Sequence, residues 1–143
     1  MQILVIETDP LIRDQVKVGL QQFAAFSVTC GEGYAGINLI RQRDFDAVFL
    51  AVPEEPREAR RMIEHLRGIR PKLDLIVLAS ERVARDLASD KQRLGIWSIH
   101  TTPIEVIDFF RLLSRVKERL GDGASVEAAP EAGSRRAQRS TAS

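Results

Sequence analysis

Five short apolar runs alternate along the chain with longer segments in which apolar residues recur at helical spacing. The runs cover residues 3–6, 26–30, 47–50, 75–78 and 96–99. Each run is too short for a buried helix, and this length is typical of a strand that is covered on both faces. Strands that alternate with amphipathic helices imply right-handed βαβ crossovers and a parallel sheet with helices on both faces. The pattern therefore predicts an α/β protein with five βα repeats.

The run at residues 47–50 is followed by Pro53, which cannot donate a hydrogen bond to a neighbouring strand. This strand should therefore end near Ala51 and open into a loop. In an open α/β sheet, sites are normally built at the carboxyl ends of the strands. Ala51 carries no nucleophile, charge or metal-binding atom, so a central position of such a site lacks reactive chemistry.

Caps and breakers delimit the predicted helices. Asp9 and Pro10 form an N-cap and a first helical position, and Gly95 is a helix stop. We expect the second, fourth and last helices at about residues 34–43, 82–94 and 103–120, and the third after residue 56. On the third helix a group of charged side chains is interpreted as a solvated face: Arg57, Arg60, Arg61 and Glu64.

The composition changes after residue 120. Gly, Ala, Ser and Pro dominate residues 121–143, and Val126 is the only large aliphatic residue there. Such a segment buries too little surface to offset its ordering entropy. We therefore expect one domain over residues 1–120 and a disordered C-terminal tail over residues 121–143.

The overall composition excludes several classes of function. A net charge of +1 argues against a dedicated nucleic-acid binder. The single cysteine, Cys30, cannot form an internal disulfide or a cysteine-built metal cluster. No apolar run approaches the roughly 20 residues that span a bilayer, and the N-terminus lacks the charged region of a signal peptide. We expect a soluble cytoplasmic domain that binds neither nucleic acid nor membrane.

Five segments match the pattern of a known family in order and spacing. They are ILVIETDPLIR (3–13), FDAVFLA (45–51), LIVLAS (75–80), GI (95–96) and TP (102–103). On these segments, residues 1–120 resemble the receiver domains of bacterial two-component response regulators. The resemblance implies a flavodoxin-like (βα)5 doubly wound parallel sheet with strand order 2-1-3-4-5. In that family a histidine kinase passes a phosphoryl group to an aspartate, and this changes which partners the domain binds.

The resemblance also assigns the five side chains on which the family's reaction depends. The two adjacent acids that hold Mg²⁺ fall on Glu7 and Thr8, and the phosphoacceptor aspartate falls on Ala51. The hydroxyl residue after the fourth strand falls on Ala79, and the lysine falls on Thr102. Because phosphoryl transfer depends on positioning and charge stabilisation, these replacements together remove the mechanism. We therefore expect no enzymatic activity, no bound metal and no cofactor.

Two hypotheses about function follow. The first is a stand-alone atypical receiver domain that acts in signal transduction as a phosphorylation-independent protein–protein interaction module. Its partner would be another signalling protein or receiver domain, including a second copy bound through the fourth helix, the fifth strand and the fifth helix. The candidate partner face is apolar and comprises Trp97, Ile99, Ile107, Phe110 and Leu112. The competing interpretation is that Trp97 and Phe110 only cover the edge of the core.

The second hypothesis is a small-molecule sensor. An uncharged cleft lined by Thr8, Ala51, Ala79 and Thr102 could accept a ligand at the former phosphorylation site. No phosphate-binding loop or cofactor motif in the sequence supports this hypothesis.

Overall fold

The computed structural model describes the backbone of residues 1–128 and the side chains of residues 1–121. Five parallel strands form one sheet in the order β2-β1-β3-β4-β5. The strands are β1 (Gln2–Ile6), β2 (Ser27–Gly31), β3 (Ala47–Ala51), β4 (Asp74–Ala79) and β5 (Ser98–Thr101). The helices are α1 (Pro10–Gln21), α2 (Gly33–Asn38), α3 (Pro56–Ile69), α4 (Glu81–Ala88) and α5 (Val106–Ala128), with a 3₁₀ turn, η1 (Leu39–Arg41), after α2. The predicted flavodoxin-like α/β fold and its strand order are confirmed.

The chain divides into two compact units, residues 1–109 and residues 110–143. The first unit contains the whole sheet, α1 to α4 and the first residues of α5. The described part of the second unit is the remainder of α5, which continues to Ala128, past the predicted helix end at Leu120. Residues 129–143 of the predicted tail lie outside the described residues. The boundary between domain and tail therefore stays a prediction.

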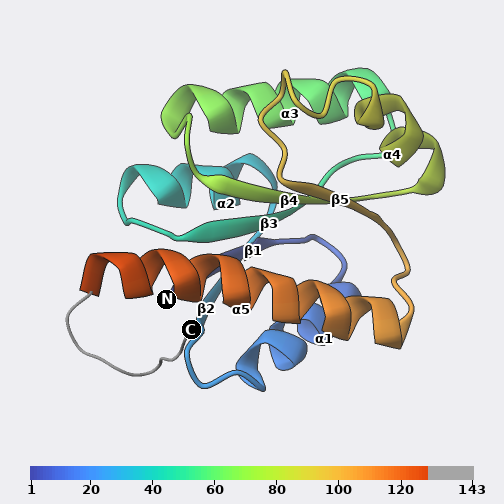
Figure 1. Cartoon of the computed structure of the whole chain (residues 1–143). Coiled ribbons are helices and arrows are strands. Elements are labelled where there is room, and N and C mark those ends of the chain that lie inside the picture. The colour runs from blue at the N-terminus through green and yellow to red at the C-terminus, as the bar shows by residue number, and fades with distance from the viewer. Residues whose placement is uncertain (129–143) are drawn as a thin grey trace. The chain divides into compact units, whose positions relative to one another are not determined.

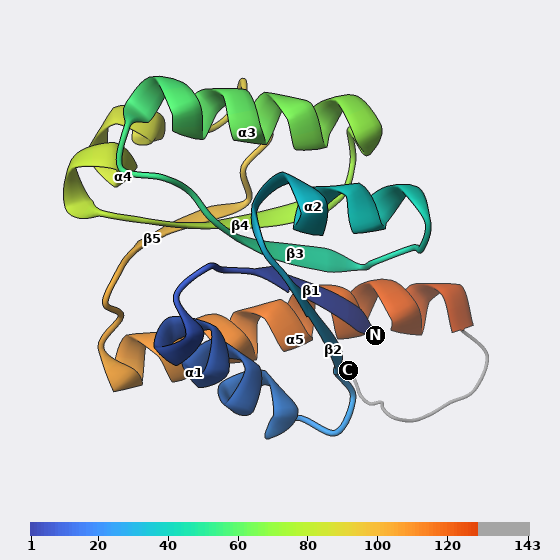
Figure 2. The same cartoon turned by 180° about the vertical axis from the view of Figure 1, so that it is seen from behind.

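Within the first unit, helices lie on both sides of the sheet. Figure 1 shows α2, α3 and α4 above the strands and α1 below them, and Figure 2 shows the same arrangement from behind. Successive strand residues point to opposite faces. Leu4 and Ile6 of β1 therefore join the buried cluster beneath α2, α3 and α4, while Ile3 and Val5 are fully buried on the side of α1. Burial on both faces explains the continuous apolar runs in the sequence.

The predicted helix starts depend on side-chain caps. Asp9 caps α1 by accepting a hydrogen bond from the backbone N–H of Leu11 at 2.9 Å. Glu55 caps α3 through the N–H of Arg57 at 2.8 Å, and the hydroxyl of Ser80 caps α4. Each cap satisfies a backbone donor that the helix itself cannot pair, which is worth about 1 kcal/mol.

The segment between α4 and β5 differs from the prediction. α4 ends at Ala88, well before residue 94, and β5 begins at Ser98, two residues after the predicted start at Ile96. Residues 89–95 form turns instead, and Gly95 ends them with a φ of +71°. Leu94 is buried although it lies outside the helix. The helical spacing of Leu94 therefore predicted its burial correctly, but it did not show that Leu94 lies outside the helix.

Arg67 of α3 connects this segment to the loop after α3. Its guanidinium donates hydrogen bonds to five backbone carbonyls, those of Arg70 (3.1 Å), Pro71 (3.1 Å), Leu73 (2.6 Å), Leu94 (3.3 Å) and Gly95. A Cβ at Gly95 would lie 2.9 Å from Nε of Arg67 and would displace the guanidinium, and the φ of +71° at this position also favours glycine. Burial lowers the pKa of Arg67, and Asp74 acts in the opposite direction. An arginine nevertheless stays charged in a protein.

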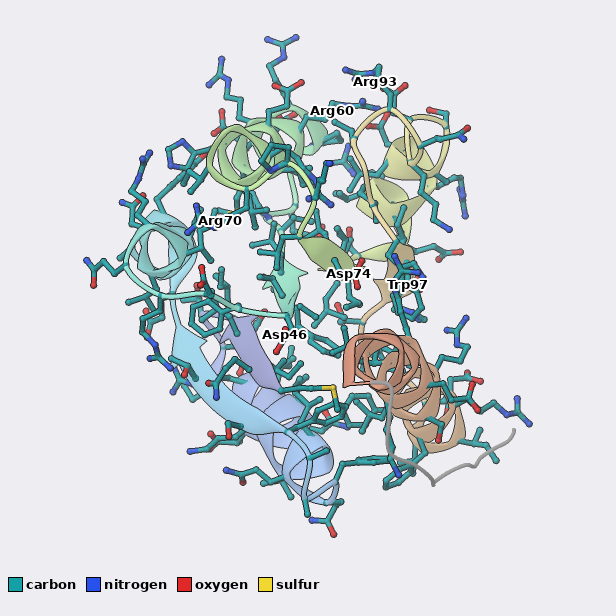
Figure 3. The ribbon with its side chains drawn as sticks, turned by 60° about the vertical axis from the view of Figure 1, so that its left-hand side comes forward. Asp46, Arg60, Arg70, Asp74, Arg93 and Trp97 are labelled. Atoms are coloured by element: carbon teal, nitrogen blue, oxygen red, sulfur yellow. The ribbon has the colours of Figure 1, made fainter. Side chains whose placement is uncertain are left out.

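Arg60 was expected on a solvated face, and that prediction is wrong. Its side chain is only 24% exposed and pairs with Asp86 of α4 at 3.0 Å and with Asp90 just after α4. Asp90 also pairs with Arg93 at 3.0 Å, and Arg93 approaches Glu64 of α3 at 4.0 Å. Figure 3 shows Arg60 and Arg93 near the junction of α3 with the segment after α4. Periodicity indicates which residues face outward but not which helix lies beside them.

Candidate functional site

The carboxyl ends of β1 and β3 open onto a pocket of about 240 Å³. The register pairs Ile6 with Leu50, so the residues that follow, Glu7 and Ala51, emerge next to each other at this edge of the sheet. Gly33 of α2 and Met62 of α3 complete the walls. The full lining is Ile6, Glu7, Thr8, Gly33, Ala51, Val52, Pro53 and Met62.

The pocket contains three of the five positions that the resemblance assigned to the phosphotransfer site, namely Glu7, Thr8 and Ala51. Ala79 and Thr102 are not among its lining residues. Ala79 is only 1% exposed. Its carbonyl accepts hydrogen bonds from the backbone N–H of Thr102 at 2.8 Å and from the Thr102 hydroxyl at 3.4 Å.

Thr102 instead borders a second, narrow pocket of about 10 Å³, together with Pro103, Ile104 and Phe109. The predicted cleft over Thr8, Ala51, Ala79 and Thr102 is therefore wrong in two respects. Only two of the four residues line the pocket, and Glu7 adds a carboxylate to a site that was expected to be uncharged.

Glu7 determines the electrostatics of the pocket. Burial raises the pKa of this carboxyl above its ordinary value, and the charge of Asp9 acts in the same direction. The backbone N–H of Asp9, which donates to Glu7 Oε1 at 3.1 Å, and the charge of Arg13 both lower the pKa of Glu7 and partly offset this rise. Arg13 itself is paired with Glu32 at 3.1 Å. Glu7 is thus a half-buried acid, and Arg13, the cation that lowers its pKa, already pairs with Glu32.

Other side chains that could bind a metal or act as a nucleophile or base are not among the residues that line this pocket. The hydroxyl of Ser80 caps α4. His65 meets the ring of Tyr34 edge-on at a centroid distance of 5.2 Å, and Nε2 of His100 lies 2.6 Å from the hydroxyl of Ser98. Cys30 is half-buried in β2. Across residues 1–121, no group of three or more His, Cys, Asp or Glu side chains is arranged to hold a metal ion.

The pocket therefore presents one carboxylate and one hydroxyl on largely apolar walls, an arrangement suited to binding a small ligand.

In the part of the chain that the structure describes, no helix is both long and apolar enough to cross a membrane.

The five residues predicted as a partner face differ in exposure. Ile107 and Phe110 are 62% and 47% exposed, and Val106, which the sequence prediction did not include, is 64% exposed. Trp97 is half-buried, with its backbone N–H donating to the carbonyl of Leu75 at 2.9 Å. Val106 is the first residue of α5 and is itself apolar, so a sequence search for apolar residues in the first turn of the last helix could have found it.

Leu112 and Ile99 were wrongly assigned to this face. Leu112 is fully buried, and it belongs to the buried stripe of α5, which comprises Phe109, Leu112, Leu113 and Val116. This is the ordinary 3-4-7 spacing of one helix face. Ile99 is half-buried and packs against the cluster beneath α2, α3 and α4, because alternation along β5 turns it to that side of the sheet.

No protein-family model matches the sequence, and no curated protein matches it either. Solved structures match in fold. The REC domain of AraT, a response regulator from Geobacillus stearothermophilus, matches with a TM-score of 0.70 and 17% identity, over 86% of this chain and 97% of that one. A CheY-like response regulator receiver domain protein from Methanospirillum hungatei JF-1 matches with a TM-score of 0.70 and 20% identity, over 87% and 97%.

The regulatory domain of the repressor of iron transport regulator (RitR), in its inactive form, matches with a TM-score of 0.67 and 19% identity, over 85% of this chain and 95% of that one. The structural neighbours are thus CheY-like receiver domains of response regulators. At 17–20% identity, these matches show that the chain shares their fold.

Proposed function

We propose that this chain is an atypical receiver domain that acts in signal transduction as a protein–protein interaction module without a phosphorylation step. The proposal rests mainly on one observation, the absence of a carboxylate on the side chain of Ala51. This residue ends β3 and lines the pocket at the carboxyl edge of a receiver fold, but it presents only a methyl group there.

The neighbouring positions support the loss of phosphotransfer. Thr8 brings no negative charge to the pocket beside Glu7, and Thr102 directs its hydroxyl to the carbonyl of Ala79. A hard cation such as Mg²⁺ is normally held by several oxygen ligands, among them carboxylates. Phosphoryl transfer also depends on compensation of the developing negative charge. These residues supply neither, so binding is the remaining use of the fold.

The start of α5 is the surface that best suits a partner. Val106, Ile107 and Phe110 are all large, apolar and exposed, and they lie within five residues of one helix. Single exposed apolar residues are normal, whereas a contiguous group is typical of an interaction surface. The partner is another signalling protein or receiver domain, including a second copy of this chain.

The test replaces Ile107 and Phe110 with aspartate in one variant and Leu11, which is 81% exposed on α1, with aspartate in a control variant. Truncating a central apolar contact typically costs 2 kcal/mol or more, roughly thirtyfold in affinity. We expect the double variant to lose self-association in sedimentation, or capture of a partner in pull-down, while its circular dichroism stays that of the wild type. A folded double variant that binds as well as the Leu11→Asp control would contradict the proposed surface.

A second candidate function, sensing of a small molecule, is favoured by one observation, the pocket of about 240 Å³ at the carboxyl ends of β1 and β3. This candidate is compatible with the first, because a ligand bound at this edge of the sheet could change which partner the domain binds.

A further inference from the structure

We propose that the pocket at the ends of β1 and β3 binds a small organic cation, an amine with an apolar body whose ammonium group pairs with Glu7. The inference rests on the second candidate function and names its class of ligand. It does not depend on the partner surface at the start of α5.

The size and walls of the pocket define the body of the ligand. A cavity of about 150 Å³ is large enough for benzene, so about 240 Å³ has room for a ring or a short branched chain with a polar head. Ile6, Val52 and Met62 provide apolar walls on different elements. A ligand without an apolar part would leave these walls uncovered and forgo most of the available binding energy.

The charge of the lining defines the head of the ligand. Glu7 is the only ionisable side chain among the eight lining residues. Its Oε1 accepts one backbone hydrogen bond, and the described residues provide no ion-pair partner for its carboxylate. Burial raises the pKa of Glu7, and the charge of Arg13 offsets this rise only in part. An ammonium group in the pocket would relieve the cost of burial by supplying a direct counter-charge and a hydrogen-bond donor.

Other ligand classes fit the lining less well. An anion such as phosphate would lie against the carboxylate of Glu7 with no cation among the lining residues, because Arg13 is engaged with Glu32. A divalent metal ion would find a single carboxylate, since Asp9 is committed to capping α1 through the N–H of Leu11. An organic ammonium ion needs only one carboxylate.

Titration of the full chain with three probes that share one body tests the class of ligand. Benzylamine, benzyl alcohol and benzoate share a phenyl ring and carry a cationic, a neutral and an anionic head group, respectively. In isothermal titration calorimetry we expect saturable binding of benzylamine, binding of benzyl alcohol at least about tenfold weaker, and no binding of benzoate. Tighter or equal binding of the alcohol or the acid would overturn the assignment, as would the absence of saturable benzylamine binding.

Three variants test the location. Glu7→Gln keeps the size and the acceptor oxygen but removes the charge, and Ala51→Leu fills part of the pocket. Both should weaken benzylamine binding at least about tenfold. Glu105→Gln is the matched control, because Glu105 is exposed and lies outside the pocket, and it should bind as the wild type does. Unchanged affinity in a folded Glu7→Gln protein, or equal weakening in the control, would refute the pocket assignment.

Failure of these titrations would be distinguishable from failure of the proposed functions. The partner surface is tested with variants at Ile107 and Phe110, which are not among the pocket residues. Binding of benzyl alcohol as tightly as benzylamine would retain a small-molecule site while excluding an amine as its ligand.

Discussion

At the scale of single residues, the sheet and the pocket place different demands on neighbouring positions. The strand residues 47–50 need only to be apolar and to fit between two layers of helices, and all four are buried. The next residue, Ala51, is partly exposed and lines the pocket. The methyl group of Ala51 offers no nucleophile at this position, and the pairing of β3 with β4 nevertheless continues to Ala51. Fold and chemistry are therefore separable at this point of the chain.

Ala51 leads to a prediction about reactivity. Incubation of the full chain with Mg²⁺ and acetyl phosphate should leave its intact mass unchanged, because no carboxylate is available at the end of β3 to act as nucleophile. Ala51→Asp restores only the carboxylate, and since Thr8 and Thr102 supply no charge, we expect no stable adduct on this variant either. A phosphoryl adduct on the wild-type protein would show that another side chain acts as the acceptor.

The pocket was only partly predictable from sequence. Positions that directly follow β1 and β3, such as Glu7 and Ala51, could be located, since parallel strands end at a common edge. Ala79 and Thr102 could not be excluded from the pocket in advance. Their exclusion depends on the packing of Ala79 at the end of β4 and on a hydrogen bond between the Thr102 hydroxyl and the Ala79 carbonyl. Neither feature has a signal in the residue pattern.

At the scale of helices and strands, ion pairs connect α3 to α4 and to the segment that follows α4. Arg60 joins α3 to Asp86 and Asp90, and Arg93 joins Asp90 from the other side. Hydrogen bonds from Arg93 and Arg60 lower the pKa of Asp90 from 3.8 to about 2. A carboxylate whose pKa is lower in the folded state stabilises the fold above its unfolded pKa, and this benefit disappears as the pH falls through the folded value.

The corresponding prediction concerns Asp90→Asn. The variant should melt at a lower temperature than the wild type at pH 7, and the difference should shrink as the pH is lowered from about 4 towards about 2, because the wild-type carboxylate is then protonated. Thermal melts followed by circular dichroism measure the difference. Asp14→Asn is the matched control, since Asp14 is exposed on α1, and it should melt as the wild type does. A difference for Asp90→Asn that persists unchanged at the low end of this range would contradict the ion-pair interpretation.

Element boundaries were less predictable than the elements themselves. All five strands were recognised from apolar runs, because burial on both faces leaves a continuous signal. The end of α4 was misplaced, because Leu94 is buried from a turn and not from a helix. The end of α5 was also misplaced. Its helical backbone continues through residues 121–128, whose composition suggested a tail. The spacing of apolar residues indicates which residues are buried, and the composition indicates whether a segment can pack against a core. Neither shows where the backbone hydrogen bonds of a helix end.

At the scale of the whole molecule, the order of the strands was implied by the resemblance to receiver domains and not by the residue pattern alone. Right-handed crossovers between parallel strands leave few topologies for five βα repeats, and the resemblance selected the order that the structure has. The long-range polar contacts could not be foreseen in the same way. Arg67 reaches the carbonyls of Leu94 and Gly95, which lie 27 and 28 positions further along the chain, and nothing in the local sequence indicates that contact.

Arg67 therefore provides a prediction for overall stability. Arg67→Met keeps much of the apolar stem but removes every donor to the five carbonyls, some of which are partly buried. Unsatisfied buried acceptors cost about 1–3 kcal/mol each, so we expect the free energy of unfolding to fall by about 2 kcal/mol or more in urea denaturation. Arg61→Met should change it by less than about 0.5 kcal/mol, because the Arg61 side chain is 63% exposed and its ion pair is with Glu58 on the same exposed helix face. Equal stabilities of the two variants would show that the Arg67 contacts contribute little.

The same contacts restrict where the chain could be reopened by protein engineering. Pro71 and Lys72 are exposed between α3 and β4, and an exposed loop tip is normally the preferred place for new termini in a circular permutant or for an inserted domain. Here the loop carbonyls converge on one guanidinium that also holds Leu94 and Gly95. A cut in this loop would therefore also remove contacts that hold the turn before β5. The loop after α3 and the turn before β5 are far apart in the sequence, but we expect them to be stabilised or destabilised together.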